Sequence, residues 1–117
     1  MALSTYGALP TSASTYVQTL QKTSALDAAT ITLTIGNTNL YAWSASQAQT
    51  INASGTQVDG QEITCIITCD ATPRVITFNT GFSANGTLTC TASKKNVIRF
   101  ISSSSVFYEI SRVVGLT

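Results

Sequence analysis

From residue 60 onward, apolar and polar positions alternate in short runs that are separated by turn residues. The runs cover residues 60–69, 74–79, 86–92, 96–101 and 106–113. Each run is rich in β-branched and aromatic residues and keeps the two-residue period of a half-buried strand. Glycine, proline, asparagine, aspartate or serine occupies the junctions. This half of the chain is therefore predicted to be all β.

The alternation also predicts which side chains face the core. Residues 30–35 are expected to form another strand, and residues 49–52 a short one. Ile66 breaks the pattern, because it lies among the polar positions of its strand, and it predicts a strand that is central in its sheet or covered on both faces. The predicted inward set is Ile31, Leu33, Ile35, Ile63, Cys65, Ile67, Cys69, Ile76, Phe78, Leu88, Cys90, Ala92, Ile98 and Phe100.

Seven or eight strands at a spacing of roughly 8–12 residues are typical of an antiparallel sandwich or barrel. The connections look too short for the crossovers of a parallel sheet. The chain has no clean internal repeat, which argues against a solenoid. The sequence therefore predicts an all-β fold, a small antiparallel β-sandwich of jelly-roll type, over residues 30–117.

Residues 1–29 are rich in serine, threonine and alanine, with spaced apolar side chains. We predict an extended N-terminal arm that contains one short helix, with two turns over residues 19–26. The alternative is a disordered tail. The spaced apolar side chains suit docking onto a neighbouring surface. The candidate assembly contacts are Leu3, Tyr6, Leu9, Tyr16, Val17 and Leu20.

Charge is scarce: 9% of the 117 residues are charged and the net charge is +1. Nucleic-acid binding needs clustered cations, and the only basic pair, Lys94-Lys95, fits a solvated turn, so no nucleic acid is expected as a partner. No apolar run reaches the roughly 18 residues of a membrane span, so no membrane partner is expected. The N-terminus lacks the pattern of a signal peptide, which argues against secretion by the usual route.

The three cysteines, Cys65, Cys69 and Cys90, are an odd number and favour reduced thiols. Cys65 and Cys69 share one strand face about 13 Å apart, too far for a disulfide. Cys90 could face either of them across the core, which leaves the thiol state open. Without histidine, a zinc site lacks suitable ligands, and all three are expected to be small buried hydrophobes.

Candidate chemistry is sparse. Asp59 and Glu62 flank one turn at a spacing that a paired-carboxylate hydrolase could use, but aspartate is ordinary in turns. Without histidine, the commonest general base is missing. We therefore expect no enzyme, cofactor or metal. Tyr41 and Trp43 are candidate glycan contacts through aromatic stacking, the other interpretation being a tryptophan packed in the core or at a subunit contact.

A series of motifs in roughly the last sixty residues resembles the small jelly-roll domains of tailed-bacteriophage virions, namely capsid decoration (cement) proteins, head fibres and tail-fibre segments. The motifs are Asp59-Gly-Gln-Glu-Ile-Thr64, Thr77-Phe-Asn-Thr-Gly-Phe82, Gly86-Thr-Leu-Thr-Cys-Thr-Ala92, Lys95-Asn-Val-Ile-Arg-Phe100 and Tyr108-Glu-Ile-Ser-Arg112. The first half of the chain carries no such motif.

The resemblance implies a homotrimer located in a virion and assembled in the host cytoplasm. Its implied partners are other copies of itself and the major capsid protein or another virion protein. The expected function is that of a trimeric decoration protein that binds and stabilises a phage capsid. The alternative is a tail-fibre or head-fibre domain that binds a receptor or glycan.

Overall fold

The computed structural model describes residues 20–117. Strands take 61% of these residues, and the described part of the chain contains no helix, so the all-β prediction is confirmed. The strands are β1 Lys22–Ser24, β2 Thr30–Ile35, β3 Leu40–Ala45, β4 Gln49–Gly55, β5 Glu62–Cys69, β6 Arg74–Phe78, β7 Phe82–Ser83, β8 Leu88–Cys90, β9 Lys95–Ser103 and β10 Val106–Leu116.

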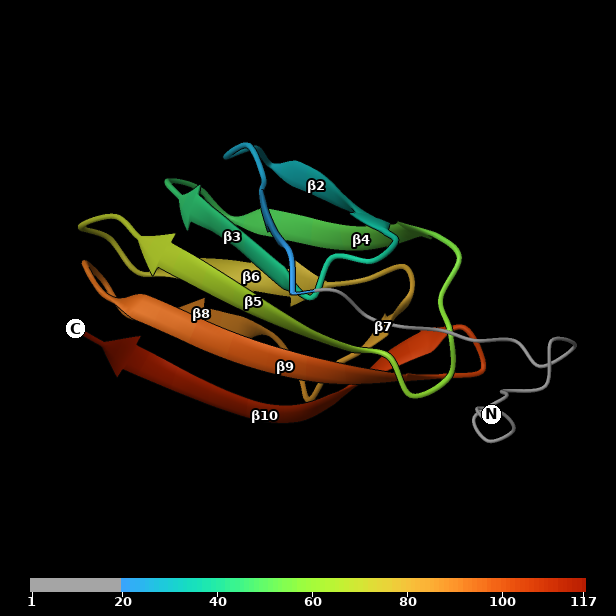
Figure 1. The fold of residues 1–117 in the computed structure, drawn as a ribbon. Helices are drawn as coiled ribbons and strands as arrows, with labels where there is room; N and C mark the ends of the chain where they lie inside the picture. The colour runs from blue at the N-terminus through green and yellow to red at the C-terminus, as the bar shows by residue number, and fades with distance from the viewer. Residues whose placement is uncertain (1–19) are drawn as a thin grey trace, which may run out of the picture.

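The strands form two sheets that face each other across the core (Figure 1). Sheet A has the order β1-β3-β5-β9-β10-β7, and sheet B has the order β2-β4-β6-β8. From β1 to β6 the chain passes from one sheet to the other with every strand. The result is a β-solenoid of about three turns, and the predicted antiparallel jelly-roll sandwich is wrong.

Parallel pairing is what separates this fold from the predicted one. β1, β3 and β5 pair in parallel in sheet A, and β2, β4 and β6 do so in sheet B. The expectation that the connections were too short for parallel crossovers failed because each crossover contains a strand of the opposite sheet. The connection from β3 to β5, for example, runs through β4.

The solenoid was not visible as a sequence repeat because its turns differ in length. Thr50 lies beside Thr30, Thr64 beside Leu40 and Ile76 beside Gln49, so the corresponding turns take 20, 24 and 27 residues. Repeat detection needs a fixed period. The expectation that the missing repeat argues against a solenoid was therefore wrong.

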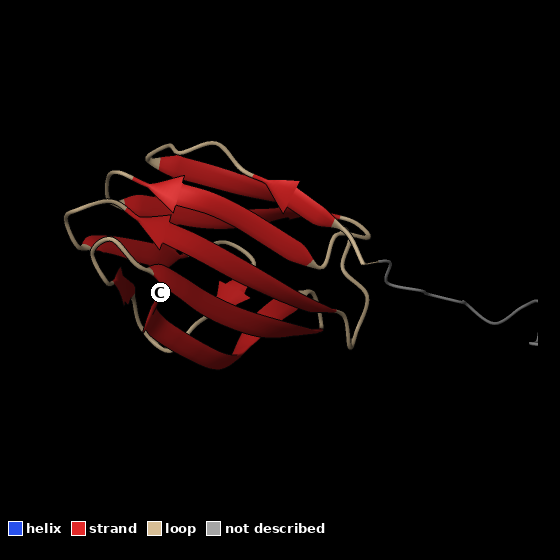
Figure 2. Cartoon of the chain, turned by 60° about the vertical axis from the view of Figure 1, so that its left-hand side comes forward, coloured by secondary structure: helices blue, strands red, loops and turns tan. Residues whose placement is uncertain are grey.

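The last strands close the C-terminal end of the solenoid with antiparallel pairs. β8 pairs with β6, β9 with β5 and β10 with β9. The short β7 adds to β10 in parallel. Figure 2 shows the loops that join the strands gathered at the two ends of the sheets.

The core lies between the sheets and contains the predicted inward set, except that Ala92 is only partly buried. Four phenylalanines from β6, β7, β9 and β10 pack against one another, with ring centroids 4.9–5.9 Å apart. Phe107, the buried residue of β10, belongs to this group. A polar residue, Asn96, is also fully buried, and its amide group bonds to Thr91, Gly115, Ile67 and Lys94 of the surrounding backbone.

Residues 20–29 of the expected arm are extended. Lys22–Ser24 pairs with the edge of sheet A, and the Gln21 carbonyl accepts hydrogen bonds from the backbone N–H groups of Asn39 and Leu40. These bonds draw the backbone into the sheet, so the short helix expected within the arm is wrong for residues 20–26. The remainder of the arm lies outside the described residues.

Candidate assembly surface

The outer faces of the two sheets differ in chemistry. Sheet B has a polar outer side that suits contact with water. It presents five exposed threonines: Thr30, Thr32, Thr34, Thr77 and Thr89. Val75, 43% exposed, is the large apolar side chain among them. Such alternation of apolar inner and polar outer positions is the ordinary pattern for a sheet with one solvated face.

Sheet A instead carries apolar side chains in a row across its outer face. The strand registers place Ala42 beside Ile66, Ile66 opposite Val97, and Val97 opposite Val113. Ala42, Ile66 and Val97 each lie between two buried residues of their strand, so their side chains point away from the core. Val113 lies opposite Val97 and therefore points to the same outer side. Ala42, Ile66 and Val97 are half-buried, and Val113 is 50% exposed. We call these four residues the apolar row.

A groove of about 600 Å³ adjoins one end of the apolar row. Ala42 and Ile66 contribute to its lining together with Leu40, and its charged lining residues are Lys22, Asp27 and Lys95. The groove therefore combines an apolar floor with a few charges.

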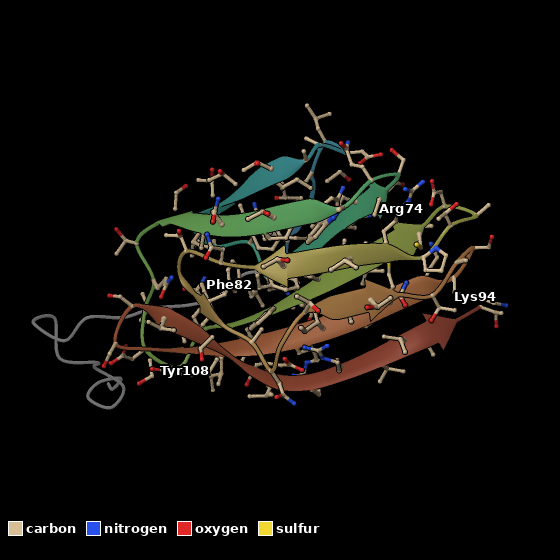
Figure 3. The ribbon with its side chains drawn as sticks, turned by 180° about the vertical axis from the view of Figure 1, so that it is seen from behind. Arg74, Phe82, Lys94 and Tyr108 are labelled. Atoms are coloured by element: carbon tan, nitrogen blue, oxygen red, sulfur yellow. The ribbon has the colours of Figure 1, made fainter. Side chains whose placement is uncertain are left out.

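β10, the strand of Val113, carries further exposed apolar side chains. Five of its side chains are large, apolar and between 43% and 50% exposed: Tyr108, Ile110, Val113, Val114 and Leu116. Tyr108 lies at the lower margin of the molecule in Figure 3. Among residues 20–117, β7 pairs with β10 only at Phe107 and Tyr108 on the side away from β9. A long apolar strand at a sheet edge is a ready site for association.

An ion pair holds β10 in place. The Arg112 guanidinium donates 2.7 and 2.8 Å hydrogen bonds to the Glu109 carboxylate and also reaches the carbonyls of Thr87 and Asn85. The Glu109 carboxylate accepts a further bond from the Asn85 N–H at 2.7 Å. Hydrogen bonding from Arg112 lowers the pKa of Glu109 below its ordinary value. This network ties β10 to the loop that leads from β7 to β8.

The N-terminal end of the solenoid has a second groove, of about 370 Å³, between residues 23–28 and β2. Leu26, Ala28, Ile31, Leu33 and Tyr41 contribute apolar lining. β2 is the last strand of sheet B within the described residues. Because backbone groups alternate in direction along a strand, part of its N–H and C=O groups point away from β4. An extended peptide segment that binds at this end would therefore find both backbone hydrogen-bonding groups and apolar side chains.

The candidate glycan contacts lie in the core. Tyr41 is 1% exposed and Trp43 is 5% exposed. The Tyr41 hydroxyl donates to the Thr34 carbonyl at 2.7 Å, and the Trp43 indole N–H donates to Gln49 Oε1 at 2.8 Å. Because both rings are covered, they have no free face on which a sugar could stack.

Of the candidate assembly contacts in the arm, Leu20 is described and is 92% exposed. The other five, Leu3, Tyr6, Leu9, Tyr16 and Val17, lie outside the described residues. They remain predictions.

The structure gives Asp59 and Glu62 separate partners. Asp59 Oδ1 accepts a 2.9 Å hydrogen bond from the Ser104 N–H, and Glu62 forms a 2.7 Å ion pair with Arg99. Within residues 20–117, no three histidine, cysteine, aspartate or glutamate side chains gather as a metal site would require. Both carboxylates have structural partners on the loop or strand next to them.

Sequence reasoning missed Val97 and Val113 as surface residues of interest. Their neighbour Ile66 was the available signal, since it breaks the polar alternation of β5 and led us to expect a second covered face. Which residues join Ile66 depends on the strand order of sheet A, which the sequence analysis did not predict.

No family model matches the chain, and no curated protein or solved structure was found to match it. Likewise, no helix in residues 20–117 has the length and apolarity to cross a membrane.

Proposed function

We propose that this chain is a non-catalytic structural protein that assembles with further copies of itself through the outer face of sheet A. The observation that carries the proposal is the apolar row, which crosses four strands on one outer face while the other outer face is threonine-rich. Removing apolar surface from water is favourable by about 25 cal/mol per Å², and part of this gain offsets the entropy that association costs. A stable interface covers on the order of 800 Å² on each partner.

A second copy of the chain is the occupant that the charges favour. The ion pair between Glu62 and Arg99 neutralises the charges near the centre of this face. With 9% charged residues and a net charge of +1, two copies meet little electrostatic repulsion. The edge of β10, with its apolar side chains, lies next to the row and extends the contact area.

The proposed setting is a virion, in which a homotrimer acts as a decoration protein that binds and stabilises a phage capsid. The resemblance of residues 59–112 to phage virion proteins supports this setting. The jelly roll that the resemblance implied is wrong, so the proposal uses the resemblance for the setting and the apolar row for the mechanism. Because Tyr41 and Trp43 are buried, we do not carry the glycan-binding alternative further.

Light scattering coupled to size-exclusion chromatography tests the self-association. We expect the full chain at micromolar concentration to have a mass three times its 12.3 kDa. The double variant Ile66→Thr, Val97→Thr keeps β-branched residues but places hydroxyl groups on the face. It should weaken association by at least about tenfold, because two anchors of the contact become polar.

Val75→Thr is the control, because Val75 is an exposed β-branched residue on the outer face of sheet B, outside the apolar row. It should leave the association constant unchanged. A monomeric wild-type chain, or equal weakening by the control and the double variant, would contradict the proposal. If the wild type is a monomer and the double variant lowers its free energy of unfolding, the apolar row stabilises the fold of a single chain, and this outcome also contradicts the proposal.

A further inference from the structure

Two of the three cysteines meet across the core. Cys69 ends β5 in sheet A, and Cys90 ends β8 in sheet B. Their sulfur atoms lie 2.8 Å apart. This separation exceeds the roughly 2.05 Å of a disulfide bond by less than an ångström. Both residues are buried.

We propose that Cys69 and Cys90 form an intramolecular disulfide that fastens sheet A to sheet B once the chain meets an oxidising environment. The site is a covalent modification site, independent of the proposed assembly. Because the two residues are 21 positions apart, the bond would enclose β6, β7 and most of β8 in one loop. It would thus secure the antiparallel strands that close the solenoid.

The hydrogen bonds around the pair show that oxidation costs few contacts. The Cys90 thiol donates to Cys69 Sγ, and the Cys69 thiol donates to the Thr72 carbonyl at 3.1 Å. A disulfide removes both S–H donors. Thr72 is exposed, so water can replace the donor to its carbonyl. The buried Cys90 carbonyl loses a longer, 3.7 Å contact from the Cys69 thiol.

Cys65 does not compete for either sulfur. It lies on the same strand and face as Cys69, and four residues of strand separate them by about 13 Å. Its side chain is fully buried, and burial raises the pKa of its thiol. The structure therefore assigns one specific pair among the three cysteines.

Oxidised glutathione is a suitable oxidant by chemical class. The Cys69 thiol, the more exposed of the two, loses its proton and attacks one glutathione sulfur, releasing the first reduced glutathione. The Cys90 thiol then loses its proton and attacks Cys69 Sγ, releasing the second. The two protons and two electrons of the thiols thus end on two glutathione molecules.

The rate in the folded chain should be slow. Burial, together with the hydrogen bond to Cys69, raises the pKa of the Cys90 thiol to about 11. Since the thiolate is the nucleophile, the second step is slow at neutral pH. Reduced thiols persist in a reducing cytoplasm and the bond forms outside it.

The test refolds the full chain from urea in a buffer of reduced and oxidised glutathione, so that access to the sulfurs does not limit the outcome. We expect free thiols to fall from three to one per chain, the intact mass to drop by two hydrogens, and the chain to stay unlinked to other copies. The midpoint of thermal unfolding should rise by roughly 10 °C or more and return on reduction.

Two alanine variants identify the pair. Cys65→Ala, the matched control, should still lose two thiols, whereas Cys69→Ala should keep both of its thiols. Fragment mass spectrometry of the unreduced wild type identifies the linked residues even if a variant fails to fold. Three free thiols after refolding, a bond that involves Cys65, or linkage only between chains would overturn the proposal.

Discussion

The Trp43 indole N–H donates a 2.8 Å hydrogen bond to the side-chain oxygen of Gln49, and both residues are buried. The bond connects the end of β3 in sheet A with the start of β4 in sheet B. Gln49 in turn donates to the Asp27 carboxylate at 2.8 Å. A polar chain thus runs from the core to the corner where the chain enters β2.

Replacing Gln49 tests this chain of contacts. Gln49→Leu leaves the buried Trp43 N–H without its acceptor and should lower the free energy of unfolding by about 1–3 kcal/mol. Urea unfolding followed by tryptophan fluorescence measures the loss. Gln47→Leu is the control, because Gln47 makes a longer, 3.5 Å contact to the same carboxylate, and it should change stability by less than about 0.5 kcal/mol. Equal losses would contradict the proposed role of Gln49.

The two ion pairs of sheet A should differ in their contribution to stability. The Glu109 side chain beside Arg112 is 9% exposed, whereas Glu62 and Arg99 are each 47% exposed. Arg112→Ala would leave a nearly buried carboxylate unpaired and should cost about 3 kcal/mol. Arg99→Ala should cost less than about 1 kcal/mol, because water solvates the exposed Glu62. Chemical unfolding measures the loss of unfolding free energy in each variant. Similar losses for Arg112→Ala and Arg99→Ala would contradict the expected difference between the two ion pairs.

Acid should weaken the fold in part through Glu109. Hydrogen bonding from Arg112 lowers the pKa of Glu109 from its ordinary 4.5, so the folded chain binds the proton less readily than the unfolded chain. The stabilisation is complete above pH 4.5 and disappears as the pH falls through the lower, folded-state pKa.

The Glu109→Gln variant measures this contribution. Its unfolding free energy should lie below that of the wild type at neutral pH, and the difference should shrink as the solution is acidified. Urea titrations across this acidic range provide the comparison. A difference that stays constant with pH would show that Glu109 does not carry the effect.

Gly55 is expected to tolerate no side chain. Its φ is +95°, and an added Cβ would lie 2.6 Å from the carbonyl oxygen of Ile35, its neighbour on β2. Gly60 also has a positive φ, +88°, but no atom within 4 Å of an added Cβ. Gly60→Ala should therefore show backbone strain alone, about 1–2 kcal/mol. Gly55→Ala should cost about 1–3 kcal/mol more, because β2 must shift. Thermal unfolding compares the two, and equal losses would contradict the close approach.

The two-residue alternation located most of the strands and the faces they bury. Thr30–Ile35 was predicted with the bounds that the structure has, and Ile63, Cys65, Ile67 and Cys69 are buried as predicted. β10 is less regular: Phe107 is its fully buried residue, whereas Tyr108 and Ile110 are 45% and 46% exposed. Apolar residues occupy both phases of this strand, so its alternation does not select a face.

The candidate surface could be predicted only in part. Ile66 stood out as an apolar residue in a polar phase, but Val97 and Val113 are unremarkable in their own strands. They form a row with Ile66 because β9 lies between β5 and β10. The cysteine pair has the same origin, since Cys90 meets Cys69 rather than Cys65 through the stacking of the sheets.

The sequence by itself determined that the chain is built of strands, where most of them lie and which side chains point inward. The tertiary structure decided which strands are neighbours and whether they run parallel. The physical reason is that alternation specifies the buried face of a strand, and parallel and antiparallel neighbours bury that face equally well. Neighbours are chosen by the lengths of the connections and the packing between sheets, and turns of 20, 24 and 27 residues leave no regular trace along the chain.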